Sequence, residues 1–485
     1  MFKFDLTLLK TKLSNFLDRF VKIFTGQDPL FHRAFFSSLG TVSSRFLAII
    51  RESISAAWLG VSPFADAFAL AQKFPSLLRR LSAEGSVENA ALPIVKDFLA
   101  RNKHVESENW IRHLLFVFLG FVSLCVIILL LTASYWTSIL YPKIVGQQKD
   151  DFLLCLYILL PCVLCYVMCT LWGTVLHANN YFFVVSFGTT VGNMFIISCM
   201  LYGYIYSKSL IWAAVASACG SLAHLIWIYI FIRRVPTYGQ GYTMPTSVSY
   251  DYSEVKSFYS MLGNALIGSG MHQLLILLSS IFAASLPVGS VTLLSKADRF
   301  FQLPISLLGV AIGTSMLTRM CEQLYANEFK QAERLYQKAL YISMFLSVVI
   351  GILMSFICVP LMKAFFMQGR FSLQNVLDTA RIFNILLLGL PAGVLIRLMN
   401  AVYFAHKDSD KGATPRGGAV VQFVVDIVCT VLFIFVFKLK AEAIALATAI
   451  SLWANVFYLI YMSYKCKFSL MPCTSLKEIF KIIVE

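Results

Sequence analysis

Long, uninterrupted apolar stretches dominate this chain and decide what it can fold into. The hydrocarbon core of a bilayer is about 30 Å thick and needs about 20 mostly apolar helical residues to cross it. Twelve such stretches follow one another: 34–60, 64–96, 111–137, 152–176, 181–206, 209–232, 257–284, 287–318, 339–366, 376–405, 417–437 and 441–464. They are continuous rather than alternating, which excludes a transmembrane β-barrel. The sequence therefore predicts an all-α polytopic membrane protein with about 12 transmembrane helices.

The composition agrees with this prediction. Of the 485 residues, 58% are hydrophobic and 13% are charged, against about 45–50% and about 25% in soluble domains. This balance excludes a soluble enzyme, a disordered scaffold and a small secreted disulfide domain. The sequence also lacks phosphate-binding loops, metal-hydrolase motifs and catalytic triads. We therefore expect no enzymatic activity, no cofactor and no nucleic-acid partner.

Lysine and arginine set the expected orientation, because cytoplasmic loops of membrane proteins are enriched in both. With the N-terminus inside, 24 of the 40 Lys and Arg residues fall on the cytoplasmic side and seven fall on the opposite side. We therefore expect both termini in the cytoplasm. Residues 1–33 carry Phe and Leu interleaved with Lys and Arg, which favours an amphipathic segment on the inner leaflet over a disordered tail.

A polar segment at 233–256 separates two groups of six spans. We expect an N-terminal lobe at 34–232, a cytoplasmic linker at 233–256, a C-terminal lobe at 257–465 and a cytoplasmic tail at 466–485. The second span of each half carries a related sequence, Lys73-Phe-Pro75-Ser-Leu-Leu and Gln302-Leu-Pro304-Ile-Ser-Leu-Leu. Chance can produce so short a match, but two related bundles around a central cavity are typical of transporters.

Nine cations fall within the predicted spans. They are Arg45, Arg51, Lys73, Arg79, Arg80, Lys296, Arg299, Arg381 and Arg397. Each charge at the bilayer centre costs about 2.5–3.5 kcal/mol on insertion scales, so these side chains cannot all face lipid. Arginine binds phosphate oxygens through a planar fork of donors that stays protonated. This surplus of arginine predicts a central cationic cavity for a large anionic ligand.

Acidic residues lie at comparable depth. They are Glu52, Asp66, Glu84, Glu88, Asp298 and Asp426. At about 100° per residue, one face of the second span carries a ladder of mixed charge made of Asp66, Lys73, Arg80, Glu84 and Glu88. We expect Pro75 to bend that helix. For Asp66, Glu84 and Glu88, structural ion pairs between helices explain the pattern as well as a place in the cavity wall does.

The 12 cysteines are scattered, mostly within spans. Cys162, Cys165 and Cys169 share one face of the fourth span, and His177 follows two turns later, so a zinc site is one interpretation. Small polarizable packing residues are the better interpretation, because no nearby acid completes a ligand set. We therefore expect no metal site, and we regard the histidines as isolated residues without an assigned function.

Asp426 in the eleventh span has no cation within one helical turn. Gln422 precedes it by one turn, and Thr448 on the next helix can approach it. A buried carboxyl without a counter-charge either takes up a proton or binds a small cation. We expect Asp426, with Gln422 and Thr448, to couple transport to Na⁺ or H⁺. A protonated, hydrogen-bonded core carboxyl is the alternative.

Three blocks of sequence carry a resemblance to known proteins. The first runs through Ser44-Arg45-Phe-Leu-Ala-Ile-Ile-Arg51-Glu52, Ala65-Asp66-Ala67-Phe68 and Lys73-Phe-Pro75-Ser-Leu-Leu-Arg79-Arg80-Leu-Ser-Ala83-Glu84-Gly85. The second is Ala297-Asp298-Arg299-Phe-Phe-Gln-Leu-Pro304, followed by Leu-Leu-Gly309-Val-Ala-Ile-Gly313-Thr, and the third is Phe366-Met-Gln-Gly369-Arg370-Phe371. Together they resemble the MurJ/MviN family of bacterial flippases, in the MOP exporter superfamily, over about residues 36–430.

The resemblance implies two six-helix lobes, alternating access and a place in the bacterial cytoplasmic membrane. The implied substrate is lipid II, the undecaprenyl-diphosphate precursor of peptidoglycan, and the implied partners are membrane lipids and cell-wall assembly proteins. Substrate binding is implied for Arg45, Arg51 and Arg299, and we group Lys73, Arg79 and Arg80 with them. Gating or positioning of the arginines is implied for Asp66, Glu84 and Asp298, and we add Glu52 and Glu88 for charge pairing.

The chain also departs from the family pattern. Glu52 stands where aspartate is usual, and the fifth span lacks the proline that usually precedes Asn193 by four residues. Family members usually have fourteen spans, against the twelve predicted here. Three alternatives to a lipid II flippase therefore stay open: a flippase for another polyprenyl-diphosphate glycan, an ion-coupled multidrug exporter of the same superfamily, and a non-transporting scaffold for cell-wall enzymes.

Overall fold

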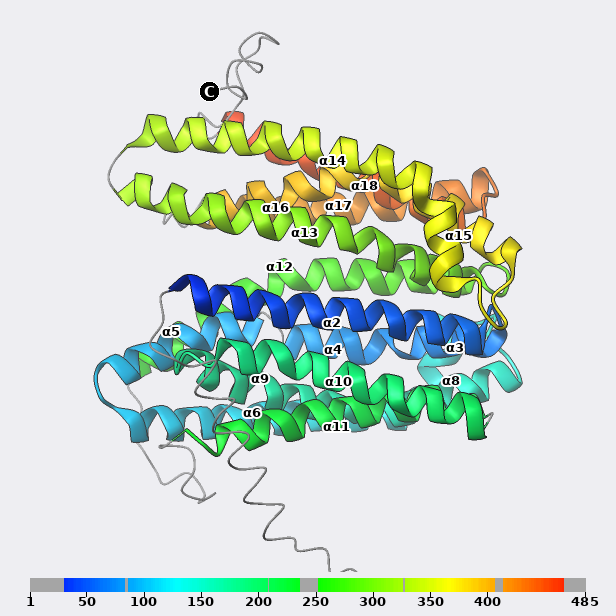
Figure 1. Ribbon diagram of the computed structural model, residues 1–485, viewed down its shortest axis with the longest axis horizontal. Coiled ribbons are helices and arrows are strands. Elements are labelled where there is room, and N and C mark those ends of the chain that lie inside the picture. The colour runs from blue at the N-terminus through cyan, green and yellow to red at the C-terminus, as the bar shows by residue number, and fades with distance from the viewer. Residues whose placement is uncertain are drawn as a thin grey trace, which may run out of the picture. The chain divides into compact units, whose positions relative to one another are not determined.

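The computed structural model describes residues 30–82, 86–207, 209–235, 252–325, 328–405 and 413–465. Throughout these ranges the regular elements are helices, and none of the described residues forms a strand (Figure 1). The predicted all-α fold is thus confirmed. Glu84, the expected amphipathic segment up to residue 29, most of the 233–256 linker and the 466–485 tail lie outside the described residues.

The helices follow the predicted spans. The first half contains α2 (Leu30–Leu59), α3 (Pro63–Ala71), α4 (Lys73–Ser82), α5 (Ser86–Ala100), α6 (His104–Leu131), α7 (Ala133–Leu140), α8 (Gln147–Leu159), α9 (Cys162–Ala178), α10 (Phe182–Tyr202), the π-helical η1 (Gly203–Ser207) and α11 (Trp212–Ile232). The second half contains α12 (Tyr252–Ala284), α13 (Ser290–Tyr325), α14 (Phe329–Phe366), α15 (Leu373–Leu387), α16 (Leu390–Ala405), α17 (Ala413–Val431), η2 (Leu432–Val436) and α18 (Ala441–Lys465). Every predicted span corresponds to one helix or to consecutive helices.

Length and hydropathy identify most of these helices as membrane spans. Among the described residues, seven helical segments are long and apolar enough to cross a bilayer, and α15 with α16, bent by 46°, makes an eighth. The other predicted spans are α2, the run from α3 to α5, α12 and α13, which are the first two spans of each expected half. These helices carry most of the intramembrane charge, which is why composition alone identifies them less readily.

Prolines explain several helix breaks. Proline lacks the N–H donor and its ring blocks the carbonyl four residues earlier, so it is favoured where a helix begins. Pro75 lies in the first turn of α4, Pro161 is the N-cap of α9, and Pro391 lies in the first turn of α16. The structure divides the second span into α3, α4 and α5, with a break at Gln72, three residues before the proline that we expected to bend this helix. The expected charge ladder stays a prediction, because Glu84 lies outside the described residues and Gln72 keeps a helical backbone conformation.

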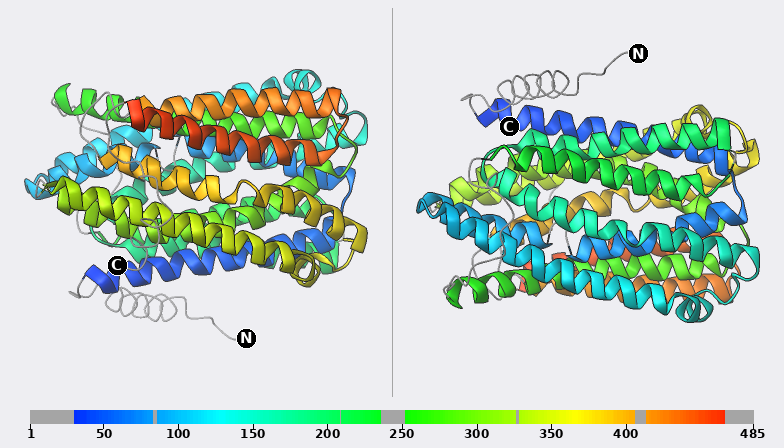
Figure 2. Two further views of the ribbon diagram at one scale, coloured as in Figure 1. Left: turned by 90° about the horizontal axis from the view of Figure 1, so that it is seen from above. Right: turned by 90° about the horizontal axis from the view of Figure 1, so that it is seen from below.

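Contacts between helices group the chain into two units. The first comprises Met1–Ser55, Leu78–Thr132 and Leu154–Ala265, and the second comprises Ala56–Leu77, Ala133–Leu153 and Leu266–Glu485. In the first unit, α10 lies along α11, and α9 packs on α5, α6 and α11. In the second unit, α13 packs on α14, α15 and α16, while α17 lies along α18 (Figures 1 and 2). The lobe boundary expected at 233–256 stays a prediction.

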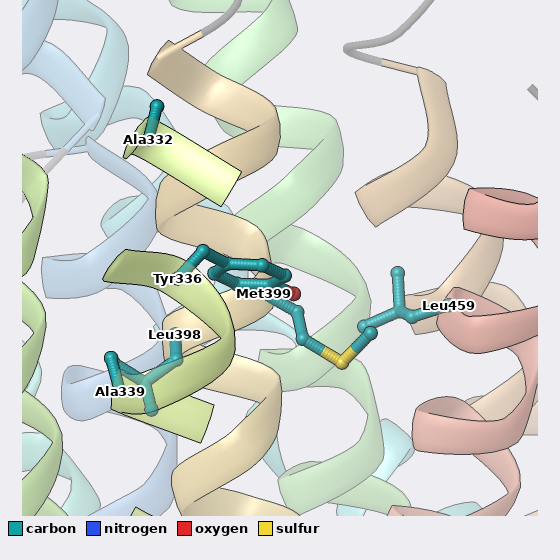
Figure 3. Packing of buried hydrophobic residues seen from close by; sticks show 6 residues of the cluster. All are labelled: Ala332, Tyr336, Ala339, Leu398, Met399 and Leu459. Carbon is teal, nitrogen blue, oxygen red and sulfur yellow. The ribbon is translucent and has the colours of Figure 1, made fainter. Parts of the chain in front are cut away.

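Each unit has a core of its own. In the first unit, Trp110 on α6 packs against Phe98 at 6.2 Å and Phe258 at 5.5 Å between ring centroids. In the second unit, a buried cluster joins α14, α16 and α18 (Figure 3), and its members are Ala332, Tyr336, Ala339, Leu398, Met399 and Leu459. Small alanines beside a large tyrosine allow close helix packing, which drives helix association where lipid removes the hydrophobic effect.

Candidate functional site

Arg51 on α2 contacts two polar neighbours within the first unit. Its Nη1 donates to Oδ1 of Asn193 on α10 at 3.1 Å, and its Nη2 donates to Oε1 of Glu52 at 3.1 Å. The Arg51 and Glu52 side chains are 22% and 15% exposed. The guanidinium is thus half-buried and oriented by two acceptors. The structure brings Glu52, grouped above with the charge-pairing acids, into contact with an arginine of the expected substrate-binding set.

Asn193 is a site residue for which the sequence pattern predicted no role. Besides accepting from Arg51, its Nδ2 donates to the Ser44 carbonyl of α2 at 3.2 Å. One turn earlier on α10, the Thr190 hydroxyl donates to the Gly40 carbonyl at 3.1 Å. A polar amide within an apolar span is costly unless it is hydrogen-bonded. That cost is the signal by which the sequence alone could have identified Asn193.

The other expected cations of the first unit are half-buried. Arg79 at the end of α4 lies over the ring of Tyr166 on α9, with 4.9 Å between its Cζ and the ring centroid. Tyr166 in turn makes an edge contact with His224 on α11 at 6.4 Å. A guanidinium over an aromatic face is attracted by the ring quadrupole, which orients Arg79. Arg45 on α2 and Arg80 on α4 are also half-buried in this unit.

Glu88 on α5 contacts His177 at the end of α9. Its Oε1 lies 2.6 Å from Nδ1 of His177, and the two side chains are 30% and 19% exposed. His177 also stacks on Phe182 with 5.4 Å between ring centroids. The expectation that the histidines are isolated is therefore wrong for His177, whose partner lies 89 residues away in the sequence. The described residues contain no cluster of three or more potential metal ligands.

Asp66 on α3 caps the N-terminus of α13 within the second unit. Its carboxylate is buried, with the residue only 3% exposed. One oxygen accepts from the Gly289 amide at 2.6 Å, and the other accepts from the amide and the hydroxyl of Thr292 at 2.8 and 2.6 Å. The first amides of a helix lack partners within it, and the helix dipole favours a negative charge there. Asp66 therefore binds the α13 terminus rather than an arginine.

Two glycines beside this cap leave no room for a Cβ atom. The Arg370 amide donates to the Ala57 carbonyl at 2.8 Å. Gly369 has a φ of +57°, and a Cβ there would lie 2.3 Å from that carbonyl oxygen. Gly289 has a φ of +97°, and its Cβ would lie 2.3 Å from Val61. Both positions require glycine, for backbone conformation and for space. We call the contacts of Asp66 and Ala57 with Gly289, Thr292 and Arg370 the latch.

Four other charged residues of the second unit lie away from this cap. Asp298 accepts from Nε2 of Gln302 at 2.6 Å on the same helix, α13. Arg299 is exposed on α13, and Lys73 is half-buried at the start of α4. Lys296 is buried, and its Nζ lies 5.7 Å from the ring centroid of Phe366. Arg299 is therefore the exposed member of this group.

Asp426 on α17 is buried at 2% exposure and is held by hydroxyl groups. Ser451 on α18 donates to it at 2.8 Å, Thr430 donates at 3.5 Å, and the Thr448 side chain also forms a hydrogen bond with it. Gln422 does not join this group; its Oε1 accepts from Nδ2 of Asn455 on α18 at 2.9 Å. Thr448 thus approaches Asp426 as expected, whereas the contacts of Ser451 and Thr430 were not expected. The coupling role of Asp426, Gln422 and Thr448 stays a prediction.

Comparison with known proteins identifies the family. A family model described as "Lipid II flippase MurJ" matches residues 55–484. The chain belongs to this family. A MurJ relative from Rhizobium meliloti (strain 1021) is 27% identical over 412 residues, which are 81% of this chain and 73% of the relative. The lipid II flippase MurJ of Burkholderia cenocepacia is 25% identical over 377 residues, 76% of this chain and 72% of its own.

Solved structures agree on the fold. A lipid II flippase MurJ in an inward closed conformation superimposes with a TM-score of 0.74, covering 92% of this chain and 90% of its own, at 21% identity. An inward-facing multidrug resistance MATE family transporter of the MOP superfamily gives a TM-score of 0.75, covering 88% and 95%, at 12% identity. The family model confirms the resemblance to the MurJ family that the sequence blocks carry, and these solved structures share the fold.

Proposed function

We propose that this chain is a flippase that moves lipid II from the inner to the outer leaflet of the bacterial cytoplasmic membrane by alternating access. Membership of the MurJ family over residues 55–484 supports the substrate class. The single observation that carries the proposal is the Arg51 guanidinium, half-buried and oriented by Glu52 and Asn193 on α2, a helix that the sequence predicts to span the membrane. A cation that is held in place at such a depth is suited to bind an anionic ligand.

The proposed ligands of the diphosphate are Arg45, Arg51 and Arg299, with Lys73, Arg79 and Arg80 extending the cationic wall. Arginine donates two parallel hydrogen bonds to phosphate oxygens and keeps its charge at every relevant pH. Each terminal nitrogen of Arg51 carries two N–H groups and uses one of them on Asn193 or Glu52. The remaining donors can bind phosphate oxygens without breaking either contact.

The latch is the proposed gate. It joins residues of the first half of the chain, Ala57 and Asp66, to Gly289, Thr292 and Arg370 of the second half. Alternating access requires contacts that hold one end closed and release it in the other state. A carboxylate on helix-terminal amides suits this purpose, because water can replace each hydrogen bond when the gate opens. Glu84 and Asp298 are proposed to assist in gating.

Ion coupling is proposed at Asp426. The carboxylate and the hydroxyls of Thr430, Thr448 and Ser451 offer oxygen ligands for Na⁺, and the same carboxylate can carry H⁺ instead. Gln422 is proposed to contribute indirectly, through its hydrogen bond with Asn455 on α18. Occupation of this site changes the charge between α17 and α18 and so favours one packing of these two helices over another.

The remaining proposals follow from the family and the charge pattern. Both termini are proposed to lie in the cytoplasm, and membrane lipids and cell-wall assembly proteins are the proposed partners. The chain is proposed to move its substrate without changing a covalent bond. The same arginines would serve another polyprenyl-diphosphate glycan, which is the second candidate. A drug exporter is less well supported, because cationic drugs require an acidic rather than an arginine-rich site.

Complementation tests the proposal. A bacterium depleted of its lipid II flippase is supplied with the wild-type chain or with Arg45→Ala, Arg51→Ala or Arg299→Ala at equal expression. Arg101→Ala is the matched control, because Arg101 directly follows α5, is 58% exposed and pairs with Asp97 in the last turn of that helix. We expect growth with wild type and with the control, and loss of growth with the other three. Growth of all variants would contradict an arginine-dependent mechanism, and failure of the wild type would favour another glycan.

A further inference from the structure

Asn193 makes two contacts that connect α10 to α2, and they differ in kind. Its Nδ2 donates to a backbone carbonyl, that of Ser44, at 3.2 Å. Its Oδ1 accepts from the side chain of Arg51 at 3.1 Å, across 142 residues of sequence. All three residues belong to the first unit. The side-chain amide of Asn193 on α10 is therefore anchored to the backbone of α2 and also binds a charged side chain of α2.

This arrangement restricts where the Arg51 guanidinium can lie. Arginine has one of the most flexible side chains, and a ligand that must immobilise it loses affinity to that ordering. Asn193 and Glu52 each bind a different terminal nitrogen of Arg51, at 3.1 Å in both cases. Two acceptors on two nitrogens fix the plane of the guanidinium as well as its position. The side chain is thereby ordered before any ligand arrives.

We propose that Asn193 is a positioning residue for substrate binding, which holds the Arg51 guanidinium in the plane that accepts the diphosphate. The inference rests on the proposed function, because it requires Arg51 to contact the substrate. Asn193 itself does not touch the substrate in this account. Its amide is suited to the task because the anchored Nδ2 determines the direction of Oδ1.

A purely structural role for Asn193, as a clamp between α10 and α2, is the competing explanation. Thr190 separates the two explanations. It lies one turn earlier on α10, is 3% exposed, and donates to the Gly40 carbonyl of α2 at 3.1 Å. It thus makes the same kind of interhelical bond as Asn193 without contacting Arg51. Replacing Thr190 by valine removes a clamp and leaves the arginine in place.

The test measures the affinity of the purified full-length protein, in lipid nanodiscs, for purified lipid II. Asn193→Leu removes both polar contacts and keeps the same number and branching of side-chain heavy atoms, and Asn193→Ala provides a second variant if the first does not fold. We expect about tenfold weaker binding for either, since a hydrogen bond to a charged group is lost. Thr190→Val is expected to stay within about twofold of wild type. The melting temperature of every variant is recorded alongside.

A double-mutant cycle on binding affinity distinguishes positioning of Arg51 from a purely structural role of Asn193. If Asn193 acts through Arg51, then Asn193→Leu costs nothing further in an Arg51→Ala background. An equal loss in both backgrounds would overturn the proposal and favour the clamp. Wild-type affinity of Asn193→Leu, with weak binding by Arg51→Ala, would overturn the positioning role alone. Wild-type affinity of Arg51→Ala would contradict the proposed function itself.

Discussion

Asp66 and Thr292 lie 226 residues apart and are joined by two hydrogen bonds, from the Thr292 amide at 2.8 Å and from its hydroxyl at 2.6 Å. Asp66→Asn keeps one oxygen acceptor but removes the charge that the α13 terminus favours, at a cost of about 1–3 kcal/mol to the latch. We expect the backbone amides of residues 289–292 to exchange faster with deuterium in this variant. Asp97→Asn, which breaks an exposed ion pair, is the control and should leave their exchange unchanged. Unchanged exchange in Asp66→Asn would contradict the cap.

Gly369 tests the close backbone contact of the latch. Gly369→Ala forces a side chain into a left-handed backbone conformation, and it also places Cβ 2.3 Å from the Ala57 carbonyl oxygen. Gly146 has nearly the same φ, +58°, but a Cβ there would enter open space, so Gly146→Ala measures the backbone cost alone. That cost is about 1–2 kcal/mol. Gly369→Ala should lower the melting temperature further than Gly146→Ala does, and equal shifts would argue against the contact.

Tyr166 tests how Arg79 is oriented. Tyr166→Phe keeps the aromatic face under the guanidinium, while Tyr166→Leu removes it. We expect Tyr166→Leu to weaken lipid II binding by about 0.5–2 kcal/mol, the range of a cation–π contact. Binding by Tyr166→Phe should match wild type. If the two variants lose the same affinity, the hydroxyl group rather than the ring orients Arg79.

Asp426 tests the coupling proposal. Asp426→Asn removes the ionisable group, so transport by this variant should no longer respond to a Na⁺ or H⁺ gradient across the vesicle membrane. Ser451→Ala removes a direct hydrogen bond to the carboxylate and should weaken the response. Gln422→Leu should change it less, because Gln422 bonds to Asn455 instead. Full activity with unchanged ion dependence in Asp426→Asn would eliminate the coupling role.

Hydropathy was sufficient to predict the helical membrane fold, because a bilayer admits few structures and each span is encoded within about 20 consecutive residues. Contacts between consecutive spans were also predictable in part, as for Asp426 on α17 and Thr448 on α18. Pro75 predicted a distortion of the second span, but a proline in a first turn and a proline within a bent helix look alike in sequence, so the position of the break at Gln72 was not predicted. Partners between distant segments were missed most often.

The residues that were missed share a physical reason. Asp66 with Gly289, Glu88 with His177, and Arg51 with Asn193 are each brought together by helix packing rather than by local periodicity. The partners of Asp66 are backbone amides, which every residue carries, so the sequence shows no complementary charged residue from which this contact could be predicted. The arginines were easier to recognise, because a cation in an apolar span is costly wherever its partner lies.

Translocation of lipid II in proteoliposomes tests the central claim most directly. The wild-type chain, Arg51→Ala, Arg299→Ala and the control Arg101→Ala are reconstituted at equal density, and the rate at which labelled lipid II crosses the bilayer is recorded. We predict rapid crossing with wild type and with Arg101→Ala, and a rate close to that of protein-free vesicles with Arg51→Ala and Arg299→Ala. Equal rates for all four proteins would contradict a flippase whose arginines bind the diphosphate.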